Sequence, residues 1–306
     1  MTLVELDGRQ LKLSNLEKVL YPEAGFTKGQ VIDYYHRIAP ALLAQIKGRP
    51  LTLKRYPDGV DGGYFYEKQC PSHRPPWVQV APVWSGQNER TINFCLVEDL
   101  PTLIWVANLA SLELHTALHR AAGSKGTPDE RWTPDMVVFD LDPGEPAAFA
   151  ECAQVGLWLR ESLDGLGLES WAKTSGSKGL QVYVPLNVGV TYEQTKPLAR
   201  RIAELLEQRI PELVVSRMTK RLRPGKVLVD WSQNDAHKTT VTVYSVRAKE
   251  RPTVSTPVSW GEVARAREQR DETLLTFTTD EVLSRAGEQG DLFAPVLSLK
   301  QELPAT

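Results

Sequence analysis

Long apolar runs are missing from this 306-residue sequence, and none approaches the roughly 18 residues that a membrane-spanning helix needs. The first ten residues, MTLVELDGRQ, also lack the charged and then apolar layout of a secretory signal peptide. We therefore expect a cytoplasmic protein without a membrane partner.

Cysteine is scarce. Cys70, Cys95 and Cys152 are too few and too scattered for a disulfide framework. Their odd number fits a reducing compartment. We therefore expect reduced, mostly buried thiols.

The sequence also lacks an excess of charge of either sign. Its 36 Lys and Arg residues against 38 Asp and Glu residues give a net charge of −2. This balance provides no long-range attraction to nucleic acid, so any DNA binding must depend on local basic patches.

Helix-start signals recur along the chain. The capping boxes Ser14-x-x-Glu17 and Thr27-x-x-Gln30 each predict a helix that follows them. Three further helices are predicted at 109–120, after Asn108, at 146–163 and at 192–209. The helix over 109–120 would carry His115 and His119 one turn apart.

Alternating and β-branched runs predict strands, and the first two of these should pair as a hairpin. The runs lie at 51–57, 64–66, 134–144, 168–173, 180–185, 227–231 and 239–246. Together with the helices they indicate an α/β (α+β) fold, in which a mixed, mostly antiparallel sheet is flanked by helices.

Two carboxylates alternate with apolar residues in VVFDLDP. Asp140 and Asp142 should project to one face of the strand while Phe139 and Leu141 face the other. Asp230, in VLVDW, lies on another predicted strand. Like charges side by side are costly, and a divalent cation between them removes that cost. Three hard oxygen donors suit Mg²⁺ or Mn²⁺, so the acids predict a two-metal nucleotidyltransferase.

Two other interpretations of Asp-x-Asp stay open at this point. Asp before Pro-Gly is common at a solvated strand-to-turn edge. Haloacid-dehalogenase-like phosphotransferases also follow an apolar strand with Asp-x-Asp, which would make Asp140 a nucleophile and match Ser175 and Lys178 to later motifs. Two features argue against that family. Gly144 occupies the position where the family has a threonine, and the motif lies at mid-chain instead of near the start.

Phosphate-binding chemistry is present near these acids. The segment 174–179, TSGSKG, offers small residues, two serine hydroxyls and a lysine, but it lacks P-loop spacing. The run 217–226 has five basic residues and no acid. Further basic and aromatic candidates for DNA binding are Lys18, Lys28, Lys54, Arg55, Phe65 and Tyr66.

In order along the chain, these motifs resemble those of one family, the polymerase domain of bacterial end-joining ligase D in the archaeo-eukaryotic primase superfamily. The matching segments are LSNLEKVLYP, TLKRYPDG, FYEK, NLASLELH, VVFDLDPG, TSGSKGL, VDWSQN, YSVRA and TPVSW. The resemblance implies a single primase-polymerase domain over 1–306, with a template- and 5′-phosphate-binding part at 1–130 and a catalytic part with an archaeo-eukaryotic primase-like core at 131–306.

The resemblance also implies roles for individual residues. Two Mn²⁺ or Mg²⁺ ions would be held by Asp140, Asp142 and Asp230. The incoming NTP or dNTP would be bound by His115, Ser175, Lys178, Gln233 and Arg247. The DNA would be contacted by Asn15, Lys18 and Lys28 at a 5′-phosphate, by Phe65 and Tyr66 at the template, and by Lys54, Arg55 and Arg223 along its path.

By this resemblance, the chain extends primer 3′-hydroxyls at gaps or broken ends in DNA repair, at the nucleoid, with a ligase and an end-bridging protein as partners. It departs from the family at Gln181, where a histidine is usual; glutamine donates a hydrogen bond but carries no proton or positive charge. A DNA-end-binding module without catalysis stays an alternative, although all three acids are present.

Overall fold

The computed structural model describes residues 1–85, 89–121 and 133–304. The chain forms two compact units, each assembled from separate segments. The first unit comprises Met1–Gly126, Thr239–Val254 and Thr278–Asp291, and the second comprises Thr127–Lys238, Ser255–Phe277 and Leu292–Thr306. The predicted boundary between residues 130 and 131 lies outside the described residues, so the division into 1–130 and 131–306 stays a prediction.

The second unit contains a six-stranded sheet in the order β13-β14-β10-β12-β11-β16. Its strands are β10 (Met136–Pro143), β11 (Trp171–Thr174), β12 (Leu180–Pro185), β13 (Val214–Val215), β14 (Val227–Asp230) and β16 (Pro257–Val258). All neighbours are antiparallel except β13 and β14. A short hairpin joins β11 to β12, whereas residues 144–170 between β10 and β11 and residues 186–213 between β12 and β13 each carry a helix.

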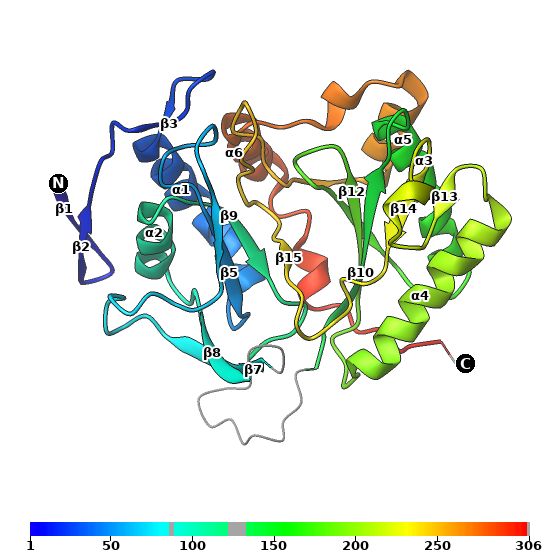
Figure 1. The fold of residues 1–306 in the computed structure, drawn as a ribbon, viewed down its shortest axis with the longest axis horizontal. Coiled ribbons are helices and arrows are strands. Elements are labelled where there is room, and N and C mark those ends of the chain that lie inside the picture. The colour runs from blue at the N-terminus through cyan, green and yellow to red at the C-terminus, as the bar shows by residue number, and fades with distance from the viewer. Residues whose placement is uncertain (86–88, 122–132, 305–306) are drawn as a thin grey trace. The chain divides into compact units, whose positions relative to one another are not determined.

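Helices cover this sheet on its apolar side (Figure 1). They are α3 (Phe149–Asp164), α4 (Tyr192–Arg209) and α5 (Trp260–Gln269). The unit also has short 3₁₀ turns at Lys220–Leu222, Glu272–Leu275 and Ala294–Leu297. Helix α3 packs on β10 and β12, and α4 packs on β10. Phe139 and Leu141 of β10 point into this core, so one face of the sheet is sealed.

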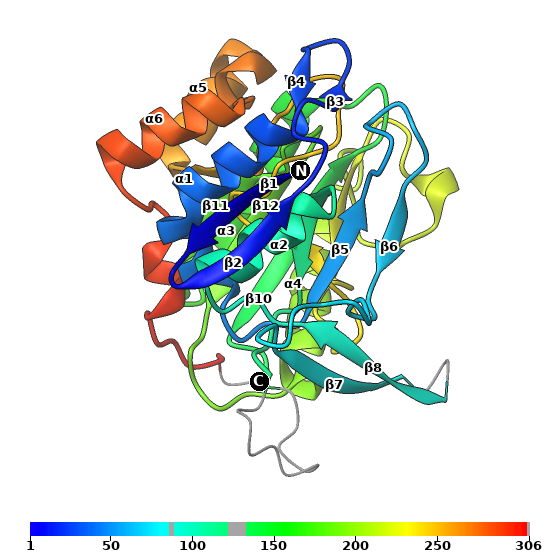
Figure 2. The same ribbon diagram turned by 90° about the vertical axis from the view of Figure 1, so that its left-hand side faces the viewer.

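The first unit contains a sheet in the order β15-β9-β5-β8-β7, with β6 pairing to β5. The strands are β5 (Leu51–Arg55), β6 (Phe65–Glu67), β7 (Val80–Ser85), β8 (Arg90–Cys95), β9 (Ser111–Thr116) and β15 (Thr240–Val241). Hairpins β1 (Thr2–Leu6) with β2 (Arg9–Leu13) and β3 (Val19–Tyr21) with β4 (Phe26–Thr27) precede it. Figure 2 shows the pairs β5–β6 and β7–β8 side by side within this unit.

The helices of the first unit are α1 (Lys28–Ile46), α2 (Leu100–Asn108) and α6 (Thr279–Gln289). Thr27 and Gln30 form the predicted capping box of α1, with hydrogen bonds of 3.3 and 2.8 Å. The mixed α/β fold with mostly antiparallel sheets flanked by helices is therefore confirmed. None of the described helices is both long and apolar enough to cross a membrane.

The helix predicted over 109–120 is wrong, because the structure has helix α2 before it and strand β9 within it. Asp99 caps α2 by accepting the N–H of Thr102, nine residues before Asn108. The left-handed Ala110 (φ 58°) then ends the helix. Strand β9, SLELHT, alternates polar and apolar residues with the period of a strand, although both of its faces are buried. His115 therefore lies on a strand.

The first capping box is also a wrong prediction, because Ser14-x-x-Glu17 starts no helix. Asn15 adopts a left-handed conformation (φ 54°), and Lys18 donates its N–H to the Asn15 carbonyl in a tight turn. Ser14 instead accepts a hydrogen bond from Lys28.

The expectation of three reduced thiols is corrected by a disulfide between Cys70 and Cys95. The two cysteines are 25 residues apart in sequence. They meet because Cys70 donates its N–H to the Asn93 carbonyl and so joins the end of β8. Cys152 is a free, buried thiol, as expected.

Candidate active site

Three carboxylates lie on one face of the second unit's sheet. Along β10, Phe139 and Leu141 are buried in the core, so Asp140 and Asp142 project to the opposite face. Asp230 of β14 is the direct antiparallel partner of Asp140. Directly opposed residues share a face, so the three predicted acids are neighbours.

The row of opposed residues continues across the sheet. Asp140 is also the partner of Gln181 on β12, and Gln181 is the partner of Lys173 on β11. Lys173 is fully buried and donates from Nζ to the Ser255 hydroxyl at 2.6 Å. The sequence analysis did not single out Lys173, whose only signal is a lysine within an otherwise strand-forming run, WAKT.

The environment of Asp140 disfavours its negative charge. Burial and the charge of Asp142, with a smaller effect of Asp230, raise the pKa of Asp140 to about 7, although a hydrogen bond with Gln181 and the charge of Lys173 oppose this. Its Oδ1 atom is buried and accepts no hydrogen bond from a described residue. A buried oxygen without a donor, beside two other carboxylates, fits a divalent cation, and these hard oxygens suit Mg²⁺ or Mn²⁺.

The turn after β14 holds Asp230 in place. Ser232 donates its N–H and its hydroxyl to Asp230 Oδ1 at 2.7 and 2.6 Å, and Gln233 donates to Oδ2 at 3.0 Å. The buried Asn234 hydrogen-bonds the backbone of Val138 on β10 through both its oxygen and its nitrogen. Across the described ranges, no group of three His, Cys, Asp or Glu side chains is already arranged around an ion. Both carboxylate oxygens of Asp230 accept hydrogen bonds from Ser232 or Gln233, so a metal ion at Asp230 would compete with these donors.

The loop between β11 and β12 lies against the acids. Ser175 accepts the N–H groups of Ser177 and Gly179 at 3.2 and 3.0 Å, which makes a tight turn. A Cβ atom on Gly179 would lie 2.4 Å from the Leu141 carbonyl oxygen. Glycine is thus required where the loop meets β10. Lys178 is exposed and pairs with Glu145 at 2.7 Å.

The basic run 217–226 packs on the turn that follows Asp142. Gly144 donates its N–H to the Lys226 carbonyl at 2.8 Å, and a Cβ atom at Gly144 would lie 2.2 Å from the Arg223 carbonyl oxygen. The threonine of the haloacid-dehalogenase motif does not fit at this position. The side chain of Arg223 donates to the Met218 carbonyl at 2.7 Å.

A second charged cluster surrounds Glu113 in the first unit, and the sequence analysis missed it. Glu113 is 1% exposed. One carboxylate oxygen lies 3.0 Å from His115 Nε2, and the other lies 3.4 Å from both Lys54 Nζ and Arg247 Nε. The Ala248 N–H also donates to it, at 3.1 Å. Three predicted site residues thus share one buried acid.

Charges in this cluster oppose the effect of burial. Burial alone would raise the pKa of Glu113, but the hydrogen bond from His115 and the charges of Arg247 and Lys54 hold it well below its usual value. Burial lowers the pKa of His115 in spite of its hydrogen bond to Glu113. Glu113 therefore stays negative, and a neutral His115 is favoured.

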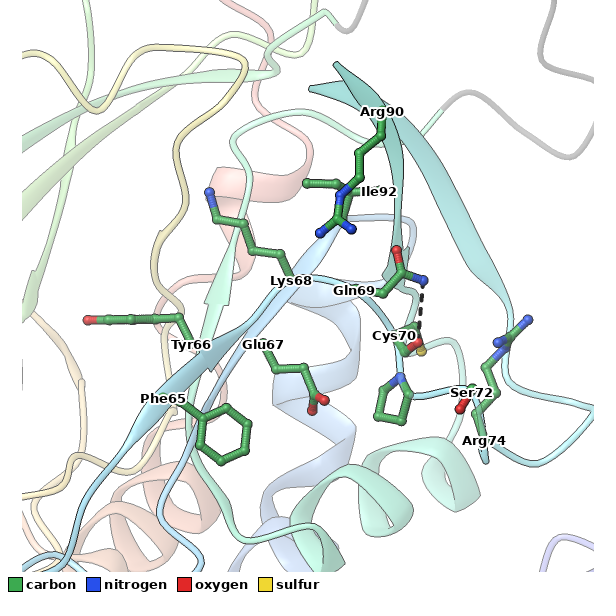
Figure 3. A pocket seen from close by; sticks show the side chains of 11 residues that line it. Phe65, Tyr66, Glu67, Lys68, Gln69, Cys70, Ser72, Arg74, Arg90 and Ile92 are labelled. Carbon is green, nitrogen blue, oxygen red and sulfur yellow. Dashed lines mark hydrogen bonds between the residues drawn. The ribbon is translucent and has the colours of Figure 1, made fainter. Parts of the chain in front are cut away.

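Aromatic rings extend this cluster outward. Lys54 Nζ lies 4.4 Å from the Tyr64 ring centre and 5.6 Å from that of Tyr66. Arg55 pairs with Glu67 at 2.9 Å and lies 5.2 Å from the Phe65 ring centre. The Phe65 and Tyr66 rings project from opposite sides of β6 (Figure 3).

Asn15, Lys18 and Lys28 come together where the turn at 15–18 meets the first residues of α1. The Lys28 N–H donates to the Lys18 carbonyl at 2.8 Å. Lys28 Nζ donates to the Ser14 carbonyl at 2.7 Å, while Lys18 pairs with Asp58 at 2.8 Å. Burial, followed by the charges of Lys18 and Arg55, lowers the pKa of Lys28 to about 8.

Comparison with known proteins identifies the family. The model of the "LigD, primase-polymerase domain" matches residues 27–293. The Multifunctional non-homologous end joining DNA repair protein LigD of Mycobacterium tuberculosis is 42% identical over 285 residues, which are 93% of this chain and 36% of that protein. The Bifunctional non-homologous end joining protein LigD of Bacillus subtilis is 31% identical over 296 residues, 96% of this chain and 45% of that protein. The chain thus spans less than half the length of these relatives.

A solved structure, the "Polymerase Domain from Mycobacterium tuberculosis Ligase D in complex with DNA", superimposes with a TM-score of 0.86 at 40% identity. The match covers 95% of this chain and 99% of that chain. These similarities do not favour the phosphotransferase or the non-catalytic alternative. The chain belongs to the LigD primase-polymerase domain family.

Proposed function

We propose that this chain is a DNA-directed nucleotidyltransferase that adds NMPs or dNMPs to a primer 3′-hydroxyl at gaps or broken ends of DNA. The observation that carries this proposal is the set of three carboxylates on one face of the sheet, where one buried oxygen of Asp140 accepts no hydrogen bond from a described residue. The DNA complex of the mycobacterial polymerase domain supports DNA as the partner.

Asp140, Asp142 and Asp230 would hold two Mn²⁺ or Mg²⁺ ions. When bound, such ions activate the attacking hydroxyl and stabilise the departing pyrophosphate. Lys173 contributes a positive charge on the same face of the sheet as Asp140, two strands away, and Gln181 orients the Asp140 carboxylate through a hydrogen bond. Both residues therefore favour the ionised form of Asp140.

The remaining predicted residues recognise substrates. Nucleotide binding is assigned to His115, Ser175, Lys178, Gln233 and Arg247. Ser175 and Lys178 lie on the loop whose Gly179 approaches Asp142, which supports a triphosphate contact there. DNA binding is assigned to Asn15, Lys18, Lys28, Lys54, Arg55, Phe65, Tyr66 and Arg223. We further propose that the protein acts at the nucleoid, with a DNA ligase and an end-bridging protein as partners.

Primer extension on gapped, 5′-phosphorylated DNA tests the proposal. Wild type and Asp140→Ala are supplied with Mn²⁺ or Mg²⁺ and with each rNTP or dNTP in turn, and a phosphatase substrate is the control. Template-dependent extension that Asp140→Ala loses is the expected result. DNA binding without any extension would indicate a scaffold, and phosphate release would indicate a phosphotransferase.

A further inference from the structure

A groove on the first unit contains basic residues to which no role has been assigned above. It has a volume of about 650 Å³ and is lined by strand β6, by the segment that follows it and by strand β8. Figure 3 shows the three basic lining residues, with Arg90 on β8, Lys68 on the segment after β6 and Arg74 beside Ser72.

The charge of the groove is positive. Lys68, Arg74 and Arg90 line it, and none of them forms an ion pair with another described residue. The one acid in the lining, Glu67, is neutralised by Arg55 at 2.9 Å. Within the described part of the chain, these three cations thus line the groove without an ion-pair partner.

The same groove begins at exposed aromatic side chains. Phe65 is 44% exposed and Tyr66 is 56% exposed. Tyr64, next to them in sequence, is 55% exposed, and several exposed apolar side chains in one place are a feature of binding surfaces. Aromatic faces next to a line of cations are the combination that binds single-stranded nucleic acid, because bases stack on the rings while phosphates meet the cations.

The walls of the groove are fixed before binding. The disulfide joins Cys70 to Cys95 of β8, and Cys70 donates its N–H to the Asn93 carbonyl at 2.7 Å. Gln69 accepts the Asn93 N–H at 3.0 Å. The loop that carries Arg74 is thus fastened to the strand that carries Arg90, which lowers the entropy cost of binding.

We propose that this groove binds single-stranded DNA that continues beyond the template contacts at Phe65 and Tyr66, with Lys68, Arg74 and Arg90 contacting its phosphates. Paired bases are already stacked on one another and cannot stack on Phe65, so the groove distinguishes single strands from duplex. The proposal rests on the proposed function, because it adds a contact for the unpaired part of the same DNA.

The test compares DNA affinities measured by fluorescence anisotropy over a range of salt concentrations. The probes are 5′-phosphorylated duplexes that end either bluntly or in a single-stranded overhang. The groove variant is Lys68→Gln/Arg74→Gln/Arg90→Gln. The matched control, Arg209→Gln/Arg265→Gln/Lys300→Gln, removes three exposed charges from the second unit. Circular dichroism and thermal melting verify that both variants fold.

We expect the groove variant to lose about tenfold in affinity for overhang DNA at low salt, with blunt-duplex affinity unchanged. The slope of log affinity against log salt for overhang DNA should fall by roughly 2, or about 0.7 for each phosphate contact. The control should keep the wild-type slope. The groove variant should still extend a primer on a gapped substrate. Extension by this variant would confirm the polymerase activity independently, so that unchanged overhang binding would count against the groove alone.

An equal loss of overhang affinity in both triple variants would overturn the proposal, because the net charge of the protein would then explain the loss. Unchanged overhang binding by the groove variant would also overturn it. If the groove variant kept overhang binding but lost binding to an acidic peptide, the occupant would be a protein and the proposal would be wrong.

Discussion

The charged clusters around Asp140 and around Glu113 carry excess charge of opposite sign. Around Asp140, three acids face one buried lysine, and the pKa of Asp140 rises to about 7. Around Glu113, one acid is shared by His115 and two cations, and its pKa falls. With all three acids ionised and no cation bound, the cluster around Asp140 has repelling negative charges. The cluster around Glu113 pairs its one acid with two cations, so an excess positive charge remains. The difference suits metal binding by the first and anion binding by the second.

Removing a charge from the first cluster should have the largest effect. Asp140→Asn keeps the size of the side chain but removes a metal ligand, so templated extension should fall by about a thousandfold or more. The thermal stability of the metal-free protein should rise, because repulsion from Asp142 and Asp230 is relieved. Primer extension and melting without metal measure the two effects, and a drop in both would mean that Asp140 is mainly structural.

The opposite outcome is expected in the second cluster. Glu113→Gln leaves Lys54 and Arg247 without a counter-charge, which should destabilise the protein by about 3 kcal/mol. Urea unfolding measures this loss, and Glu67→Gln is a control in which a more exposed acid of the same unit is removed. Wild-type stability of Glu113→Gln would contradict the role given to the cluster.

Acid should remove the same stabilisation. Because the pKa of Glu113 is lowered by folding, its contribution is complete above the ordinary carboxyl pKa and is lost as pH falls below it. Stability of the wild type should therefore decline more steeply on acidification than that of Glu113→Gln. Parallel pH profiles would show that Glu113 is not the responsible group.

A smaller effect is expected at Lys28, whose pKa is lowered to about 8. Preference for a 5′-phosphate over a 5′-hydroxyl should fall by about tenfold as pH rises from roughly 7 to 9.5, because Lys28 loses its charge. Stability should change in the opposite direction, since the burial cost of the charged lysine disappears as it deprotonates. Lys28→Arg keeps a positive charge over this pH range, so its preference for a 5′-phosphate should stay constant. If the preference of the wild type also stayed constant, Lys28 would be excluded from the 5′-phosphate pocket.

The smallest effect concerns the exposed pair of Lys178 and Glu145. Glu145→Gln frees Lys178 for a triphosphate and should raise nucleotide affinity by about twofold. The KM for the incoming nucleotide measures this. Lys178→Gln in the same background should remove the gain, and a gain that survives would assign it to another residue.

Local patterns were sufficient where one short segment carried the information. The period of two in VVFDLDP placed Asp140 and Asp142 opposite the core, and the capping box at Thr27 located the start of α1. The family motifs were readable for the same reason. Each is a contiguous run whose residue types are set by one turn or one strand.

Other features depended on contacts between segments far apart in sequence. The pairing of Asp230 with Asp140 spans 90 residues. The pairing of Gln181 with Asp140 brings the β11–β12 hairpin, and with it the buried Lys173, to the row of acids. Glu113 could not be recognised from NLASLELH because its partners Lys54 and Arg247 lie on other segments.

The sequence by itself determined the mixed α/β class, the family, and the face of β10 that carries its carboxylates, because each depends on side-chain periodicity or on contiguous motifs. Only the tertiary structure decided that His115 lies on a strand, that Cys70 bonds Cys95, and that the buried Lys173 lies in the same row as Asp140. The physical reason is that strand register and burial are fixed by long-range pairing, so the free energy of these groups depends on neighbours that local sequence does not contain.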